Sequence, residues 1–197
     1  MKITIKALLF ALIAGVPAIN ASVGLQNNNT ITSLESIDTT TLEVLTITNC
    51  SNLSSLAGLN APLLKCLRIF DCLNLSSLTG LNAPALEFLT IYSCDNLSSL
   101  DGLYAPALKR LSINHCSNSL SLDSLNAPAL EALAFYDCSN LSSLAGLNAP
   151  ALKSLTIEVC DNLPPLAAEE FIRWNRKSSF LATVVLAERA RAAEEDD

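Results

Sequence analysis

The sequence predicts an α/β solenoid, in which short parallel β-strands stack into one sheet and the segments between them lead from each strand to the next. Two observations support this prediction. Cysteines recur every 22 residues, and most of them follow a Leu-x-Ile pattern at a constant distance. Self-similarity at a fixed period of about 20 to 50 residues is the signature of a solenoid. The recurring cysteines are Cys50, Cys72, Cys94, Cys116, Cys138 and Cys160.

The N-terminal segment, residues 1–21, has the features of a secretory signal peptide. Two lysines precede an apolar run from Ala7 to Val16, which is too short to cross a bilayer, and small residues follow. Cleavage is expected after Ala21, with Ala18 as the alternative. The competing interpretations are an uncleaved anchor and a buried first strand. We therefore expect a secreted, periplasmic or cell-surface protein with no membrane span after cleavage.

Residues 22–166 hold the repeats, which correspond to about seven rungs of the solenoid. The Leu-x-Ile spacing is a period-two alternation, so one short strand per repeat directs these two side chains inward. The leucines that follow each cysteine come every third residue, which suits a 3₁₀-like or extended return segment. Glycine and Ala-Pro then mark the corner before the next strand. A single repeat cannot bury its apolar face, whereas stacked repeats can. One repeat places its core at Leu42, Leu45, Ile47, Cys50, Leu53, Leu56 and Leu59.

This pattern resembles the leucine-rich-repeat family over about residues 23–166. The Cys-x-x-Leu spacing is most similar to cysteine-containing repeats and to those of plant immune receptors, whereas the repeat length is closer to bacterial internalin-type repeats. The resemblance implies a curved right-handed superhelix with a parallel β-sheet on its concave face, and a ligand-binding role for that face. Asn28 occupies the place of the cysteine in the first rung. In the family the two residues interchange there and satisfy backbone groups of the turn.

The cysteines have two interpretations. They form either a ladder of buried free thiols or a set of disulfides, since an exported chain meets an oxidising compartment. Side chains at equivalent positions of stacked rungs point in parallel, which fits the torsion of a disulfide poorly, so the thiol ladder is favoured. A seventh cysteine, Cys66, falls on the outward side of its strand. No metal or cofactor is expected, because sulfurs in a line do not form a tetrahedral site.

The outward strand positions are the candidate partner-binding site. They vary between repeats while the core positions stay constant, and they are rich in aromatic residues and arginine, as protein-binding patches are. The alternative is that they only cover a solvated sheet. The candidate residues are Arg68, Phe70, Phe88, Tyr92, Arg110, Asn114, Tyr136 and Glu158.

Charge and motifs exclude other classes of function. The formal net charge is −7, and no basic patch for nucleic acid is present in the sequence. The single histidine, His115, precedes Cys116, but neighbours along a strand face opposite sides, so they cannot act as base and nucleophile. The sequence contains no phosphate loop, metal-spaced histidines or nucleophile elbow. We therefore expect no enzymatic activity.

Residues 167–197 are rich in helix-forming residues and end in an acidic tail. We expect a helical C-terminal cap over the open end of the core, because terminal repeats need capping. The alternative is a helix that docks on a partner or on a membrane.

The expected function is that of an exported leucine-rich-repeat module, a monomer, that recognises a protein partner through its concave sheet. One alternative is a surface-adhesion protein that binds carbohydrate. Another is a host-directed effector of an intracellular bacterium, whose thiols would stay reduced. Glycosylation is left open, because Asn-x-Ser/Thr triplets carry glycans only in a eukaryotic secretory pathway. These triplets begin at Asn28, Asn49, Asn52, Asn74, Asn96 and Asn140.

Overall fold

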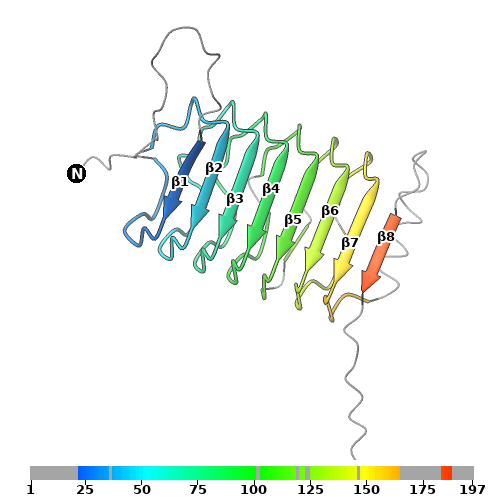
Figure 1. Ribbon diagram of the computed structural model, residues 1–197. Coiled ribbons are helices and arrows are strands. Elements are labelled where there is room, and N and C mark those ends of the chain that lie inside the picture. Colours follow the sequence, from blue (N-terminus) through cyan, green and yellow to red (C-terminus); the bar gives the residue numbers. More distant parts are fainter. Residues whose placement is uncertain are drawn as a thin grey trace, which may run out of the picture.

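The described part of the chain forms a parallel β-solenoid (Figure 1). The computed structural model describes residues 22–35, 37–100, 103–118, 120–122, 125–145, 147–164 and 183–187 of the 197 residues. One sheet of eight strands runs through them in sequence order, and every pair of neighbours is parallel. The strands are β1 (Ser22–Gln26), β2 (Val44–Thr48), β3 (Cys66–Phe70), β4 (Phe88–Tyr92), β5 (Arg110–Asn114), β6 (Ala132–Tyr136), β7 (Ser154–Glu158) and β8 (Thr183–Ala187).

The strand register reproduces the sequence period. Leu45 pairs with Leu67, and Leu67 pairs with Leu89, so equivalent residues of successive repeats lie side by side. The second and fourth residues of each strand from β1 to β7 are buried, and the first, third and fifth face outward. The predicted alternation is therefore confirmed in all seven strands. In-register pairing stacks each inward apolar side chain on the equivalent apolar side chain of the next repeat.

The return segments are extended and bent rather than helical. Leu53, Leu56 and Leu59 are each fully buried, as the three-residue spacing predicts. Isolated i→i+3 hydrogen bonds form the corners, such as that from Leu53 N to Cys50 O at 3.1 Å. None of the described residues is helical, so the expected α/β solenoid is, in this part of the chain, a β-solenoid. The reason is that leucines every third residue leave no 3.6-residue stripe for a helix to bury.

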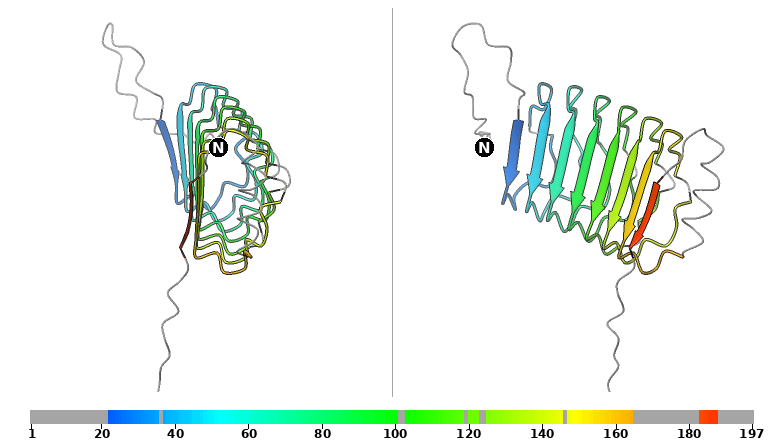
Figure 2. Two further views of the ribbon diagram at one scale, coloured as in Figure 1. Left: turned by 90° about the vertical axis from the view of Figure 1, so that its right-hand side faces the viewer. Right: turned by 45° about the vertical axis from the view of Figure 1, so that its right-hand side comes forward.

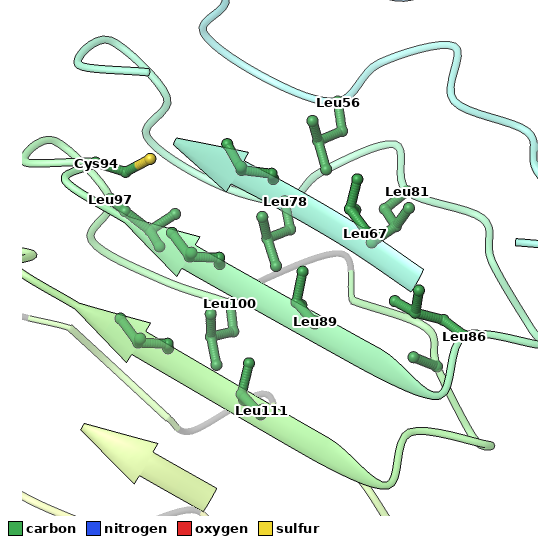
Figure 3. Close-up of a cluster of buried hydrophobic side chains, with 14 of the residues drawn as sticks. Leu56, Leu67, Leu78, Leu81, Leu86, Leu89, Cys94, Leu97, Leu100 and Leu111 are labelled. Carbon is green, nitrogen blue, oxygen red and sulfur yellow. The ribbon is translucent and has the colours of Figure 1, made fainter. Parts of the chain in front are cut away.

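The core fills the space between the sheet and the return segments. Viewed along the solenoid, the strands lie on one side and the return segments on the other (Figure 2, left). Leucines from both sides meet between them, as Leu67, Leu78 and Leu100 do in Figure 3. No buried side-chain nitrogen or oxygen of the described residues lacks a hydrogen-bond partner. The core is apolar apart from Thr39, whose hydroxyl donates to Asn60 O at 2.8 Å, and each rung needs neighbours to cover it.

The cysteines form the predicted ladder of free thiols. All seven are unpaired, and those from Cys50 to Cys138 that keep the repeat spacing are buried. Each ladder thiol donates to the carbonyl oxygen two residues earlier, as Cys72 Sγ does to Phe70 O at 3.4 Å. The backbone N–H group of Cys72 in turn faces the sulfur of Cys94. The ladder therefore satisfies polar backbone groups at the corner after each strand.

The asparagines two residues after each ladder position tie neighbouring turns together. Asn74 Nδ2 donates to Ser51 O at 2.6 Å, and Asn162 Nδ2 donates to Asn140 Oδ1 at 3.1 Å. Several of the Asn-x-Ser triplets begin at these residues, so their amide groups serve the solenoid.

The structure describes part of the C-terminal segment and none of the N-terminal one. The signal-peptide segment, residues 1–21, lies outside the described residues. Of the expected helical cap over residues 167–197, the structure describes only Thr183–Ala187, and these form strand β8 rather than a helix. β8 pairs with β7, whose outer edge would otherwise leave backbone groups unpaired. Its Thr-Val-Val sequence has the β-branched residues that favour a strand. No helix long and apolar enough to span a bilayer occurs among the described residues.

Candidate functional site

The outward side chains of β1–β7, which we term the open sheet face, form three columns along the solenoid. The return segments all lie on the other side of the sheet (Figure 2). The register aligns first residues with first residues, third with third and fifth with fifth. All eight predicted site residues lie on this face, in β3–β7: Arg68, Phe70, Phe88, Tyr92, Arg110, Asn114, Tyr136 and Glu158.

A hollow of about 320 Å³ lies on this face across β4–β7, and we term it the β4–β7 groove. Its cause is a change of side-chain size within the columns. In the first column the large side chains Phe88 and Arg110 are followed by the small ones Ala132 and Ser154. The surface of the sheet is therefore lower over the first residues of β6 and β7 than over those of β4 and β5. The residues that line it are Phe88, Leu89, Thr90, Arg110, Leu111, Ser112, Ala132, Leu133, Ala134, Tyr136, Ser154 and Thr156.

Large side chains stand on two sides of the groove. The guanidinium carbon of Arg110 lies 5.9 Å from the centroid of the Phe88 ring, a cation–π contact between neighbours in the first column. Tyr136, in the third column, stands on another side. Arg110 is the only charged residue among the lining residues described. The groove therefore combines an apolar floor, two aromatic rings and one positive charge.

A second cluster lies in the third column and at its edge, and we term it the aromatic row. The ring centroids of Phe70 and Tyr92 are 6.3 Å apart, and those of Tyr92 and His115 are 4.8 Å apart in an edge-to-face arrangement. His115 Nδ1 lies 3.0 Å from Asp137 Oδ2. These contacts hold the side chains in fixed positions on an exposed surface, but none of the four lines the groove.

The structure thus divides the predicted site residues. Phe88, Arg110 and Tyr136 meet at the groove, and Phe70 and Tyr92 belong to the aromatic row. Asn114 Nδ2 donates to Ser112 Oγ at 3.2 Å and to Ile91 O at 3.4 Å, beside the groove.

The other two predicted residues lie outside the groove lining. Arg68 is exposed in the second column of β3, and Glu158 is half-buried in the third column of β7.

The prediction missed the small residues that create the groove. Ser112, Ala132, Ala134, Ser154 and Thr156 line it, although a search for large or charged side chains passes over them. The signal in the sequence was a succession of small residues at outward positions of two adjacent repeats.

The sequence prediction also missed a ladder of alternating charge beside the first column. The residue just before each strand from β2 to β7 is in turn Glu43, Lys65, Glu87, Lys109, Glu131 and Lys153. Each glutamate forms an ion pair with the lysine of the following repeat, with N–O distances of 3.0, 2.8 and 2.9 Å. The Lys153 ammonium, hydrogen-bonded to Glu131, holds the pKa of that carboxyl below its usual value. We term this set the charge ladder.

His115 and Cys116 lie on opposite sides of the chain, as predicted. The side chain of His115 is about half exposed, whereas Cys116 is buried and donates its proton to Asn114 O at 3.4 Å. Burial raises the pKa of Cys116 to about 11. Within the described segments, no three His, Cys, Asp or Glu side chains gather where they could hold a metal ion.

Comparison with known proteins finds no family that matches the chain and no curated protein that is similar to it. The leucine-rich-repeat resemblance therefore rests on the residues of this chain alone.

Proposed function

We propose that the chain is an exported binding protein of the leucine-rich-repeat type that recognises a protein partner through the β4–β7 groove. The observation that carries this proposal is the groove itself, an apolar floor beside Arg110, Phe88 and Tyr136 on the open sheet face. Aromatic and arginine side chains that surround a pocket are typical of the central residues of protein interfaces. The curved, concave form of the sheet and the monomeric state are parts of the same proposal.

A protein partner is favoured over carbohydrate by the chemistry of the lining. Sugars present many hydroxyl groups, each of which both donates and accepts, and carboxylate or amide side chains match them well. None of the described lining residues is Asp, Glu, Asn or Gln. The polar lining side chains are instead hydroxyls and one guanidinium, which leaves much of the floor apolar.

Two features of the chain favour different places of action. The N-terminal segment, residues 1–21, supports export to the cell surface, the periplasm or the medium. The seven free thiols favour the alternative of an effector that works in a reducing host cytosol, where thiols persist. In both cases the binding face is the same.

The test compares two single substitutions in the same column. Ala134→Trp fills the groove floor, whereas Thr46→Trp adds the same side chain to the second column of β2, outside the groove. The chain from residue 22 and both variants are immobilised, and bound proteins from the producing organism and its surroundings are quantified by mass spectrometry. A partner of the groove is retained by the unmodified chain and Thr46→Trp and lost with Ala134→Trp. Equal recovery from all three proteins, each shown to be folded by circular dichroism, would contradict the proposal.

A further inference from the structure

We propose that the β4–β7 groove recognises an acidic peptide segment, in which a carboxylate binds Arg110 and a neighbouring apolar side chain lies over Ala132 and Ala134. This inference rests on the proposed function and specifies the chemistry of the partner. It follows from the charge of the groove, from its size and from the groups that line it.

Arg110 has two carboxylates in its surroundings. The carboxylates nearest to it in sequence register are Glu87 and Glu131, which precede β4 and β6. Each already forms an ion pair with a lysine, Glu87 with Lys109 at 2.8 Å and Glu131 with Lys153 at 2.9 Å. Among the described residues, Arg110 forms no ion pair of its own. It acts through space on Glu131, whose pKa it helps to lower, and its N–H groups remain available to an anion that enters the groove.

The position of the guanidinium group fits this role. The guanidinium carbon of Arg110 lies over the Phe88 ring at 5.9 Å from its centroid, a cation–π contact that favours this side-chain position before any ligand binds. A guanidinium presents a fork of N–H groups, two of which a carboxylate can accept at once. A side chain fixed in advance loses less conformational entropy on binding.

The size of the groove limits what can enter it. A volume of about 320 Å³ lies at the lower end of ligand pockets, so the groove accepts one or two side chains and not a folded element. Phe88 and Tyr136 stand beside the Ala132 and Ala134 floor, and an aliphatic or aromatic side chain can pack there between rings. The hydroxyls of Ser154 and Thr156 are available to the peptide backbone, whereas that of Ser112 is hydrogen-bonded to the Asn114 amide.

The experiment uses two probes that differ only in charge, 3-phenylpropionate and 3-phenylpropanamide. The methyl groups of Ala132 and Ala134 are followed by NMR in the chain from residue 22 during titration with each probe. We expect both methyls to shift and the carboxylate to bind about tenfold more tightly than the amide, because a hydrogen-bonded charge pair is lost with the amide. Added salt should reduce this ratio, since the contact is exposed.

Matched variants separate the contribution of the Arg110 charge to probe affinity from that of the groove's shape. In Arg110→Gln the two probes should bind with equal affinity, whereas Arg68→Gln, which removes a cation from the same face outside the groove, should leave the tenfold ratio unchanged. Ala134→Trp should abolish the binding of both probes. Thr46→Trp should change nothing.

Three results would overturn the inference. The first is equal affinity for the two probes in the unmodified chain. The second is the absence of methyl shifts with either probe up to about 10 mM, a concentration at which a fragment that fits is expected to bind. The third is a shift of both alanines with cellobiose, a neutral sugar, and none with the carboxylate. None of these decides the proposed function, which fails only if partner recovery is insensitive to Ala134→Trp.

Discussion

The residue that follows each strand from β1 to β7 has a left-handed backbone, with φ between 51° and 56°. These residues are Asn27, Asn49, Asp71, Ser93, His115, Asp137 and Val159. Their N–H groups reach the next rung, as that of Asn49 does to Phe70 O at 2.9 Å, and the turn directs the ladder position into the core. Asn and Asp tolerate this conformation, whereas a β-branched residue is strained by it. Val159 is therefore the most strained member of the column.

We predict that Val159→Asn stabilises the chain by about 1 kcal/mol, since it relieves a left-handed conformation that β-branched residues rarely adopt. Urea unfolding followed by circular dichroism measures the change. The substitution Ser93→Val introduces a β-branched residue at the equivalent position of another repeat, and it should destabilise the chain by a similar amount. A Val159→Asn variant no more stable than the parent would show that the column carries no strain at this position.

The buried thiols predict a dependence of stability on alkaline pH. Burial raises the pKa of Cys94 to about 12 and that of Cys116 to about 11, from an ordinary value of 9.0. The folded chain keeps both protons at a pH where the unfolded chain releases them. The stability that the neutral thiols give is therefore complete below about pH 9 and is lost as the pH rises toward 11 to 12.

The expected slope is at most about 1.4 kcal/mol per pH unit for each of the two thiols. Unfolding in urea at a series of pH values above 9 measures it. Other groups also titrate in this range, so the comparison is with Cys94→Ala/Cys116→Ala, which should lose stability less steeply. Parallel pH profiles for the two proteins would mean that these thiols ionise equally in the folded and unfolded chains.

At the scale of the element, one turn of the return segment depends on glycine. Gly80 has φ of 91°, and a Cβ atom there would lie 2.6 Å from Ala57 Cα in the preceding rung. The close approach is between backbones, so no flexible side chain can move aside. Gly58 shows the same combination against Glu35. The corner thus fixes the spacing of neighbouring turns.

We predict that Gly80→Ala destabilises the chain by about 2 kcal/mol or more, because the methyl group adds a backbone clash to an unfavourable φ. Gly24→Ala is the control, since a Cβ atom at Gly24 meets nothing closer than Gln26 Nε2 at 4.0 Å. That variant should unfold within about 0.5 kcal/mol of the parent. Similar urea midpoints for both variants would contradict the role assigned to the Gly80 corner.

Strands β2–β7 could be predicted from the repeat pattern of the sequence, whereas β8 and the groove could not. The alternation in Leu45 and Ile47 fixes which side chains point inward, and the constant period then fixes the register of every later strand. Residues 183–187 lie outside the repeat among helix-forming residues, and their strand forms because the edge of β7 is available. The groove depends on Ala132 and Ala134 lying beside larger side chains of neighbouring strands, which a search for functional side chains does not consider.

At the scale of the whole molecule, the charge ladder has a period of two repeats while the core has a period of one. Glu87 lies between Lys65 and Lys109, and Glu131 lies between Lys109 and Lys153. Isolated exposed ion pairs contribute little, but like charges in adjacent rungs repel. A solenoid in which each rung contacts only its neighbours can lose a rung and close again. Loss of one rung brings two like charges of the charge ladder together, whereas loss of two rungs preserves the alternation.

We predict that deletion of residues 82–103 and deletion of residues 82–125 respond differently to salt. The first brings Lys65 next to Lys109, whereas the second brings Lys65 next to Glu131 and preserves the alternation. Between about 0.05 and about 0.5 M NaCl, the one-repeat deletion should gain about 0.5 to 1 kcal/mol of stability relative to the two-repeat deletion, because salt screens the repulsion. Urea unfolding measures both, and Lys109→Gln in the one-repeat deletion should remove the difference. An identical salt response would contradict the prediction.

The two periods also bear on how such a gene can change its length. Recombination between misaligned copies adds or removes whole coding units, and every such event leaves the leucine core in phase. Only exchanges that shift the alignment by an even number of units keep glutamate codons next to lysine codons. Residues 82–103 and residues 126–147, two repeats apart, both carry glutamate at the ladder position, as Glu87 and Glu131. Variants of this gene that differ in length are therefore expected to differ in steps of two units.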